Sequence, residues 1–392
     1  MTQRFGYGPF RGASEEEAFA QIALQCFNFP SVAWDPYLQR VGRESFRVLR
    51  SRGRVLGGLA IYRMGQYFGG RSIPTGGIAL VGVPPEVRAS GVAKTLMERT
   101  LLELHEEGTP LSTLYPATQR LYRKVGYEQA GSRVEYTMPG RSFSEKDRSL
   151  SASPVPTTDP APFTELYKLW AERGNGLLDR NRAIWERVLR PYGEDAIYAY
   201  RFGEERSEGY VVFTQRRQES GYNLVILDWV ALTPAAYRRL LSFLGDHRSL
   251  ARTVLWYGPA GESLLCLFEE QDALCVRRQE RWMLRIVDAE RAISQRGYPA
   301  DVKGELHLKI HDGLIRANEG RFVLRVANGR GGVERGGRGR LEMDIRALAA
   351  LYASFLTPIA LHSMGWMRGD SASLATATRL FSGPEPWMPD PF

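Results

Sequence analysis

Cysteine and histidine are scarce in this chain of 392 residues, which holds three cysteines and five histidines. Three cysteines cannot all pair with one another, and the spacing of Cys26, Cys266 and Cys275 matches no metal-binding motif. We therefore expect reduced thiols and no bound metal, as is usual for a protein of the cytoplasm.

Long apolar runs are also missing from the sequence. No run approaches the ~20 apolar residues that a membrane-spanning helix requires. The first ten residues, MTQRFGYGPF, contain no apolar core of a secretion signal. These absences predict a cytoplasmic protein without a membrane partner.

Acidic residues are fewer than basic ones, with 44 Asp and Glu against 52 Lys and Arg, and the net charge is +8. Such a charge is also found in nucleic-acid-binding proteins, but no stacking-aromatic motif of an RNA-recognition module accompanies the arginines. We interpret the arginine clusters as solvated surfaces and the Gly-rich stretch 330–340 as a flexible loop, and we expect no nucleic-acid partner.

The stretch from Gly76 to Tyr127 carries the clearest pattern in the chain. Ile78–Val83 is a short apolar run that predicts a buried strand, and two prolines end it. The segment Arg88–Ala93 then opens a helix, because the following apolar residues fall near one helical face: Val92, Leu96, Met97, Leu101 and Leu104. A strand, a small-residue loop and a helix N-terminus together form an anion site, since unpaired N–H groups point into the loop.

The loop sequence narrows the kind of anion site. A Walker loop requires a Gly-Lys-Ser/Thr ending and a dinucleotide loop requires three glycines, whereas only Gly91 is present here. The pattern Arg88-x-x-Gly91-x-Ala93 resembles instead the pyrophosphate loop of the GNAT acetyltransferase superfamily. The resemblance implies that acetyl-CoA, as cosubstrate, contacts both the strand and the loop, at Val81, Gly82, Val83, Arg88, Ala89, Ser90, Gly91, Val92 and Ala93.

Residues downstream of the loop strengthen this resemblance. Leu111–Tyr115 predicts a second buried strand, and Gln119–Val125 predicts a short helix with Gly126 at its C-terminal end. The run Leu-Tyr-x-x-x-Gly-Tyr that ends at Tyr127 is similar to a superfamily motif whose first tyrosine faces the cofactor sulfur. In this chain that tyrosine is Tyr122.

The chemistry of acetyl transfer assigns further expected roles. Backbone N–H groups of Val81–Val83 can polarise the thioester carbonyl if a bulge splays the strand there. A phenol suits the protonation of the leaving thiolate, because its pKa of about 10 lies near that of a thiol. The resemblance implies that Tyr122 is this general acid; the alternative is that Tyr122 is a core residue. Tyr127 is expected to pack.

The chain as a whole divides into three predicted domains, at residues 1–140, 141–284 and 285–392. The second begins with a Ser- and Pro-rich linker and repeats the element order of the first, but its loop Ala231–Ala236 has neither Arg nor Gly. We interpret it as a degenerate copy. The third resembles a sterol-carrier-protein fold, because alternating strands are followed by helices. The expected fold class is α+β, with two GNAT-like mixed-sheet domains in tandem before a sterol-carrier-protein-like domain.

This order, with the junction Trp282–Asp288, resembles the Eis (enhanced intracellular survival) acetyltransferase family over essentially the whole chain. The resemblance implies a homohexamer and N-acetyl transfer from acetyl-CoA to an amine. It also implies that the C-terminal carboxylate, here of Phe392, enters the first domain as general base. The last ten residues, GPEPWMPDPF, hold four prolines and large apolar side chains, which favours a docked tail. The alternative is a tail that closes a subunit interface.

The chain departs from the best-known Eis members at two acidic positions with which they hold polycationic aminoglycosides. The residue before the last is Pro391, and the segment after the first helix reads Phe27-Asn28-Phe29-Pro30. Fewer carboxylates on a positive chain hold a polycation less well, although Asp390 could substitute in part.

The expected function is therefore transfer of acetyl to an amine acceptor, a small-molecule or lysine-like amine. Two alternatives come from other classes of protein. One is a lipid- or acyl-CoA-binding oligomeric protein without catalysis, and the other is an inactive GNAT scaffold.

Overall fold

The structure, a computed structural model, describes residues 5–28, 31–191, 193, 196–271 and 273–392, which form two compact units. The first unit comprises Met1–Ala130, Trp282–Gly383 and Phe392, and the second comprises Gly131–Arg281 and Pro384–Pro391. The third predicted domain thus groups with the first unit, apart from its last residues before Phe392.

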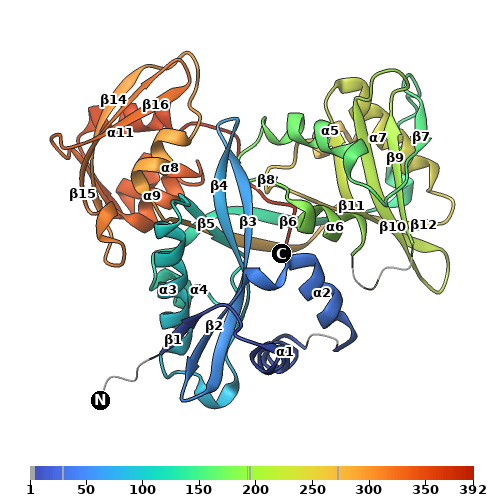
Figure 1. The fold of residues 1–392 in the computed structure, drawn as a ribbon. Coiled ribbons are helices and arrows are strands. Elements are labelled where there is room, and N and C mark those ends of the chain that lie inside the picture. The colour runs from blue at the N-terminus through green and yellow to red at the C-terminus, as the bar shows by residue number, and fades with distance from the viewer. Residues whose placement is uncertain (1–4, 29–30, 192, 194–195, 272) are drawn as a thin grey trace. The chain divides into compact units, whose positions relative to one another are not determined.

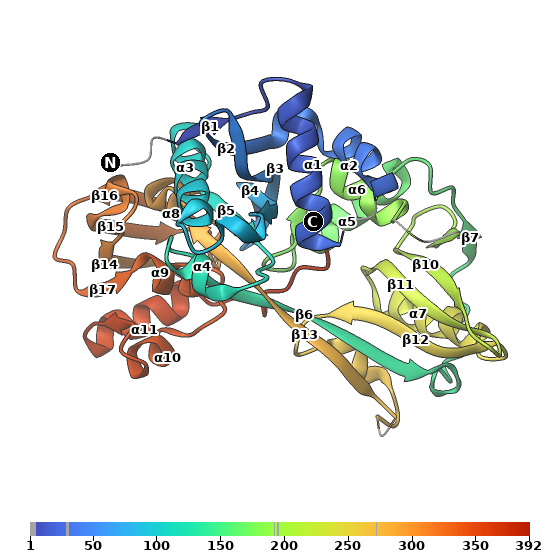
Figure 2. The ribbon, with the colours of Figure 1, turned by 90° about the horizontal axis from the view of Figure 1, so that it is seen from below.

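The sheet of the first unit follows the order β1-β2-β3-β4-β5-β13. Its strands are β1 (Gly6–Gly8), β2 (Phe46–Ser51), β3 (Arg54–Phe68), β4 (Arg71–Gly82), β5 (Leu111–Leu114) and the end of β13 (Cys275–Ile286). Figure 2 shows α1 (Ala13–Phe27) and α2 (Trp34–Val41) on one side of β2–β4 and α3 (Val92–Glu106) on the other. The short α4 (Gln119–Arg123) follows β5.

Amphipathic patterning explains the placement of α3. All five apolar residues predicted for its inner face are buried against β2–β4, which confirms the predicted helical face. β4 is longer than predicted, because it begins at Arg71 and not at Ile78, and it ends at Gly82, so that Val83 lies beyond it. The extra residues form a hairpin with β3 through a turn at Gly69 and Gly70, both of which have positive φ.

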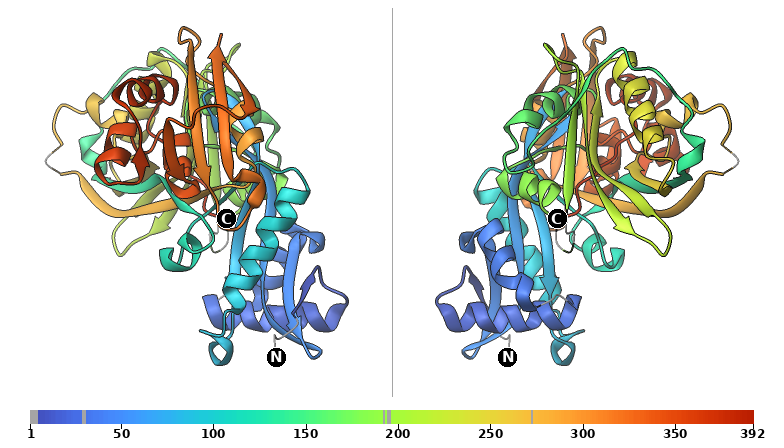
Figure 3. Two further views of the ribbon diagram at one scale, coloured as in Figure 1. Left: turned by 90° about the vertical axis from the view of Figure 1, so that its left-hand side faces the viewer. Right: turned by 90° about the vertical axis from the view of Figure 1, so that its right-hand side faces the viewer.

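The C-terminal part of the first unit has its own sheet, in the order β16-β15-β14-β17-β18. The strands are β14 (Gly304–His311), β15 (Gly320–Ala327), β16 (Arg330–Arg335), β17 (Leu341–Asp344) and β18 (Met367–Arg368). Figure 3 shows helices on one side of this sheet, from α9 (Ile345–Tyr352) through α10 (Pro358–Ser363) to α11 (Ser371–Leu380). The helix α8 (Ala289–Gln295) contacts β15 and β16.

One prediction for this part is wrong. The Gly-rich stretch 330–340 is not simply a flexible loop, because Arg330–Arg335 pairs along its length with β15 as strand β16. Glycine carries no apolar signal, so the pairing could not be read from side-chain alternation.

The second unit has a sheet in the order β6-β12-β11-β10-β9-β7. These strands are β6 (Glu128–Pro139), β7 (Ala152–Pro154), β9 (Ile197–Phe202), β10 (Gly209–Arg217), β11 (Tyr222–Ala231) and β12 (Ala251–Gly258), with a short β8 (Leu178–Asp179) apart from them. Figure 1 shows α5 (Ala161–Ala171), α6 (Arg182–Leu189) and α7 (Pro234–Asp246) around this sheet. The predicted linker contributes β7, which pairs with β9, and the fully buried Phe143.

Cysteine, metal and membrane features can be stated for the described residues. All three cysteines are free, and Cys266 and Cys275 are exposed. No cluster of three or more potential metal ligands occurs in the part of the chain that is described. Nor does any helix of that part combine the length and the apolar character needed to cross a membrane.

Candidate functional site

The strand β4 contains the bulge that the carbonyl-polarising hypothesis requires. Gly58 of β3 pairs with Gly82, but Ala60 pairs with Ala79, so Leu80 and Val81 together face a single residue of β3. Leu80 adopts a positive φ of 56°. A bulge of this kind bends its strand and redirects the backbone groups next to it.

The strands β4 and β5 separate beyond the middle of β4. Their parallel pairing runs from Thr75 opposite Leu111 to Gly77 opposite Thr113, whereas β4 continues to Gly82. The residues of β4 after Gly77 therefore have backbone groups that β5 does not use. We call this point of separation, at Gly77 and Thr113, the fork.

The loop after β4 leads into an uncapped helix. Gly91 is the N-cap of α3 with a φ of 88°, and no side chain of the described residues caps the first helical N–H groups. Ala89 also has a positive φ, of 62°. The hydroxyl of Ser90 donates to the Val87 carbonyl at 2.6 Å, so it faces the loop's own backbone. The free N–H groups and the positive end of the helix dipole form an anion-binding site.

A basic pocket of about 370 Å³ lies at this loop. Of the predicted cofactor residues it is lined by Val83, Arg88, Ala89, Gly91, Val92 and Ala93, whereas Val81, Gly82 and Ser90 are not among its lining residues. Sequence reasoning missed three further basic side chains that line it: Lys94, Arg120 and Lys124. The latter two lie four residues apart at α4. This spacing places two side chains on one face of a helix, so it indicates a shared basic face.

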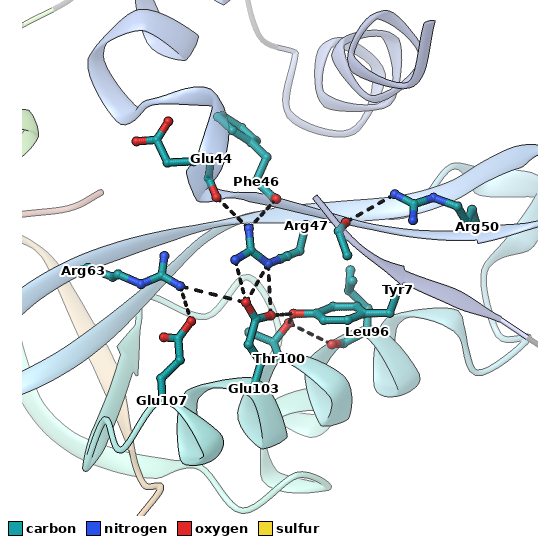
Figure 4. Close-up of polar contacts among 11 residues, drawn as sticks. Tyr7, Glu44, Phe46, Arg47, Arg50, Arg63, Leu96, Thr100, Glu103 and Glu107 are labelled. Carbon is teal, nitrogen blue, oxygen red and sulfur yellow. Dashed lines mark hydrogen bonds and ion pairs between the residues drawn. The ribbon is translucent and has the colours of Figure 1, made fainter. Parts of the chain in front are cut away.

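A polar network holds α3 on the sheet (Figure 4). Arg47 of β2 donates to Glu103 of α3 from Nε at 2.8 Å and from Nη2 at 2.5 Å. Tyr7 of β1 also donates to Glu103. Burial opposes ionisation of Glu103, but the hydrogen bonds from Arg47 and Tyr7 outweigh it and lower the pKa of this carboxyl. This network fastens the C-terminal half of α3 to β1 and β2.

Tyr122 lies in α4 with 6% of its surface exposed, and its ring meets that of Tyr127 edge to face at 6.0 Å. Burial raises the pKa of Tyr122 to about 12, so its phenol stays protonated near neutral pH. The Tyr127 hydroxyl lies 2.6 Å from Ser112 Oγ, and Ser112 donates to the Gly76 carbonyl. Since a carbonyl only accepts, Tyr127 is the donor to Ser112, which gives Tyr127 a structural role.

The terminal residue Phe392 belongs to the first unit and packs at the fork. Its ring centroid lies 5.5 Å from that of Tyr62 in β3. A methyl group added at Gly77 would lie 2.8 Å from Phe392 Cε2, so the ring rests directly on the backbone of β4. Gly77 is the last β4 residue paired with β5.

The preceding residues of the tail are docked within the second unit. Trp387 packs edge to face against Trp170 at 5.6 Å, and the Met388 N–H donates to the Ser132 carbonyl. Asp390 is buried and accepts a hydrogen bond from Arg180 at 3.0 Å. It is therefore not a free acid that could hold a polycation. The chain also departs from the Eis pattern in the segment after the first helix. Two residues of that segment, Phe29 and Pro30, lie outside the described residues.

The second unit repeats the bulge but not the anion loop. Val212 pairs with Asp228 and Phe213 with Ile226, which leaves Leu227 of β11 as an extra residue. The side chain of Thr233 caps α7 by accepting the Ala236 N–H at 3.1 Å, and the Glu208 carboxylate accepts the Thr233 hydroxyl. The N-terminus of α7 is thus capped by a side chain and lies beside a carboxylate, and both features disfavour phosphate binding there. The N-terminus of α3 is uncapped and is surrounded by basic side chains.

The second unit also contains a carboxyl group that makes its stability depend on pH. Glu262 is 6% exposed; its Oε1 accepts the Leu264 N–H at 2.9 Å, while Oε2 has no hydrogen-bond partner among the described residues. Burial raises the pKa of Glu262 to about 7 from 4.5. Because the folded pKa is raised, the stability that protonation gives is fully present below pH 4.5 and is lost as the pH rises through 7.

We therefore expect Glu262→Gln to stabilise the protein at pH 8 by up to about 3 kcal/mol, at 1.36 kcal/mol per pKa unit. The glutamine keeps the acceptor for Leu264 and removes only the ionisable oxygen. Near pH 5 the two proteins should be almost equally stable. Urea unfolding followed by tryptophan fluorescence at both pH values measures this, and an equal difference at pH 5 and pH 8 would contradict the assignment.

Comparison with protein families agrees with this geometry. Residues 11–130 and 176–286 each match an acetyltransferase (GNAT) domain, and residues 289–389 match a sterol carrier protein domain.

Whole-chain comparisons give the same result. The crystal structure of a GCN5-related N-acetyltransferase from Anabaena variabilis is 41% identical, with a TM-score of 0.96 over 99% of this chain and 100% of that one. An uncharacterized N-acetyltransferase of Streptomyces avermitilis is 27% identical over 98% of this chain and 94% of its own length. The N-acetyltransferase Eis of Mycobacterium tuberculosis is 25% identical over 71% of each chain.

Proposed function

Because this chain belongs to the GCN5-related N-acetyltransferases, as an Eis-like member with a sterol-carrier-like C-terminal domain, we propose that it acetylates an amine at the fork of its first unit. The observation that carries the proposal is the bulged strand β4 leading into the uncapped N-terminus of α3 within a basic pocket. These features suit the carbonyl and the phosphates of acetyl-CoA respectively.

The binding roles follow from the chemistry of these groups. Arg88 to Ala93, with the basic side chains of the same pocket, hold the pyrophosphate through N–H groups and charge. Backbone N–H groups of Val81–Val83, redirected by the bulge, donate to the thioester carbonyl and stabilise the negative charge that develops on its oxygen.

The proton transfers are assigned to two groups of the first unit. The Phe392 carboxylate accepts one proton of the ammonium, and the neutral amine nitrogen then bonds to the carbonyl carbon through its lone pair. The nitrogen gives up its second proton as the amide forms, and that proton restores the phenol of Tyr122 after the thiolate has left. Tyr122 donates its phenolic proton to the sulfur as the C–S bond breaks, and its raised pKa keeps that proton available. The ring of Phe392 on Gly77 supports the placement of the chain end at the fork.

The proposal also covers the acceptor substrate and the oligomeric state. The acceptor is a small-molecule or lysine-like amine, in keeping with the Eis-like relatives, and the protein acts as a homohexamer. The second unit contributes no acetyl-CoA site, because the N-terminus of α7 is capped by its own Thr233.

We expect Gly91→Glu to abolish acetyl-CoA binding, because it places bulk and negative charge at the pyrophosphate site. Space allows the substitution, since no atom lies within 4 Å of a Cβ added at Gly91. Gly91→Ala is the matched control, because it carries the same backbone strain at positive φ without the charge.

Calorimetric titration of the three proteins with acetyl-CoA measures this. Wild type should bind one acetyl-CoA per chain, the alanine variant should bind with a similar or moderately weaker affinity, and the glutamate variant should not bind. Unchanged affinity in Gly91→Glu would remove the loop assignment, and two equivalent sites per chain would refute the interpretation of the second unit as degenerate.

A further inference from the structure

A pocket of about 300 Å³ lies wholly within the second unit, and four aromatic rings contribute to its lining: Trp170, Trp229, Tyr237 and Trp387. The Trp170 ring lies 5.7 Å from that of Trp229 at 52° and 5.6 Å from that of Trp387 at 84°. The Tyr237 ring meets that of Trp229 at 5.9 Å and 75°. Because the rings are inclined to one another and not stacked in parallel, they form adjoining walls, as in the aromatic cages that hold cations.

Two carboxyl groups also line this pocket. Glu262 is 6% exposed, and its Oε2 is buried without a hydrogen-bond partner among the described residues. Glu385 is exposed and accepts the Gly261 N–H at 2.8 Å. Neither forms an ion pair with a basic side chain of the part of the chain that is described. A buried carboxylate oxygen without a donor is unfavourable, and a cation beside it offsets that cost.

The basic side chain of the pocket does not cancel this charge. Arg173 is the one basic residue of the lining; it is exposed, and its Nη1 donates to the Leu232 carbonyl at 3.0 Å. Solvent therefore screens its charge more than that of the buried Glu262. Burial, followed by the charges of Glu262 and Glu385, raises the pKa of Tyr136 to about 12, so both carboxyl groups act on the same region.

The pocket lies where two parallel strands separate, as the fork does in the first unit. Parallel pairing of β11 with β12 ends at Val225 opposite Leu255, whereas β11 continues to Ala231. Trp229 and Ala231 line the pocket from the part of β11 beyond this pairing. The second unit thus keeps a binding position of the same topology, but it offers rings and carboxyl groups there in place of a site for phosphates.

These features select a particular kind of cation. Aromatic rings attract a cation through their electron-rich faces, and the attraction is largest for tryptophan. A primary ammonium group needs three hydrogen-bond acceptors, which aromatic rings do not supply, whereas a quaternary ammonium group has no N–H donor to satisfy. A volume of about 300 Å³ suits a small molecule.

We propose that this pocket binds a small quaternary ammonium ion, held by the tryptophan rings and beside Glu262. The inference goes beyond the proposed acetyl transfer and does not rest on it, because every lining residue belongs to the second unit and a quaternary nitrogen cannot be acetylated.

The first test compares two ligands of the same shape that differ in charge. Choline and its uncharged isostere 3,3-dimethyl-1-butanol are each titrated into the full-length protein at pH 8, and binding is followed by tryptophan fluorescence, since three indoles line the pocket. We expect choline to bind about tenfold more tightly than the isostere, or better. Equal affinities, or no binding of choline, would overturn the inference.

Glu262→Gln should weaken choline binding about tenfold and leave the affinity for the isostere unchanged, because it removes one charge and keeps the acceptor for the Leu264 N–H. Since this variant is expected to be more stable than wild type at pH 8, its loss of binding cannot be ascribed to unfolding. Glu186→Gln removes a carboxylate of α6 outside the pocket lining and should bind choline as wild type does. Choline bound at the fork would be insensitive to Glu262→Gln, and that result contradicts the inference.

The same carboxyl group predicts a dependence on pH. Burial raises the pKa of Glu262 to about 7, and choline keeps its charge at every pH, so choline should bind more tightly as the pH rises from about 6 to about 8. The other titratable or charged groups that face the pocket are those of Glu385, Arg173, Tyr136 and Tyr237. The dependence should be absent in Glu262→Gln, and its persistence there would overturn the placement of the cation beside Glu262.

Discussion

Replacement of Tyr122 by Phe is expected to lower kcat by about 10²–10⁴-fold while the affinity for acetyl-CoA stays the same. The hydroxyl acts only as the thiolate leaves, so its loss affects the transition state and not the bound ground state. The Tyr122 side chain is 6% exposed as a whole, and its hydroxyl forms no hydrogen bond with another described residue, so removal of the hydroxyl breaks no such contact. Single-turnover kinetics, in which the chemical step is observed directly, measure the effect.

Tyr127→Phe, five residues further along the chain, provides the matched control. Its hydroxyl donates to the buried Ser112, so its loss leaves an acceptor unsatisfied and should cost about 1 kcal/mol of unfolding free energy with kcat nearly unchanged. Tyr122→Phe should instead lower kcat and leave the free energy of unfolding nearly unchanged. A loss below threefold in kcat for Tyr122→Phe, with chemistry rate-limiting, would return Tyr122 to a packing role.

Extension of the chain beyond Phe392 is expected to reduce turnover by at least about 10²-fold, because the terminal carboxylate becomes an uncharged peptide group that cannot accept a proton. The extension replaces no core residue of either unit, so the melting temperature and acetyl-CoA affinity should match those of protein with an N-terminal tag. Deletion of Phe392 should also inactivate the protein, since the chain would then end one residue short of the fork.

The sharpest form of this experiment removes the charge and nothing else. Semisynthesis that ends the chain in a Phe392 carboxamide keeps the ring on Gly77 and replaces one oxygen by a nitrogen. The carboxamide protein should bind acetyl-CoA normally and turn over about as slowly as the extended protein. Equal turnover of the carboxylate and carboxamide proteins on an accepted amine would eliminate the carboxylate as base.

The sequence predicted those elements whose position is determined by residues close together in the chain. The apolar spacing along α3 was sufficient to place that helix on the sheet. Asp344, a residue type that favours the N-cap position, precedes the apolar run of α9, and its side chain accepts the Ala347 N–H at 2.8 Å. In both cases the determining interactions lie within a few residues of one another.

Features that depend on distant residues could not be predicted in this way. Asp390 and Arg180 are 210 residues apart, and their ion pair holds a carboxyl group that the sequence presents as free. Likewise, nothing local assigns the end of β13 to the first unit, where Met283–Ile286 pairs with β5. The first half of β4, with two adjacent glycines, gives no apolar alternation and exists because β3 supplies its hydrogen bonds.

Acetyl transfer to an amine at the fork is tested most directly by incubating untagged protein with acetyl-CoA and a panel of small-molecule amines and lysine-like amines, and measuring thiol release and the mass of each amine together. We predict amine-dependent thiol release, with one acetyl group gained by the amine for each thiol released, and no release by Gly91→Glu. Absence of amine-dependent release for every amine, under conditions in which calorimetry shows acetyl-CoA bound, would contradict it.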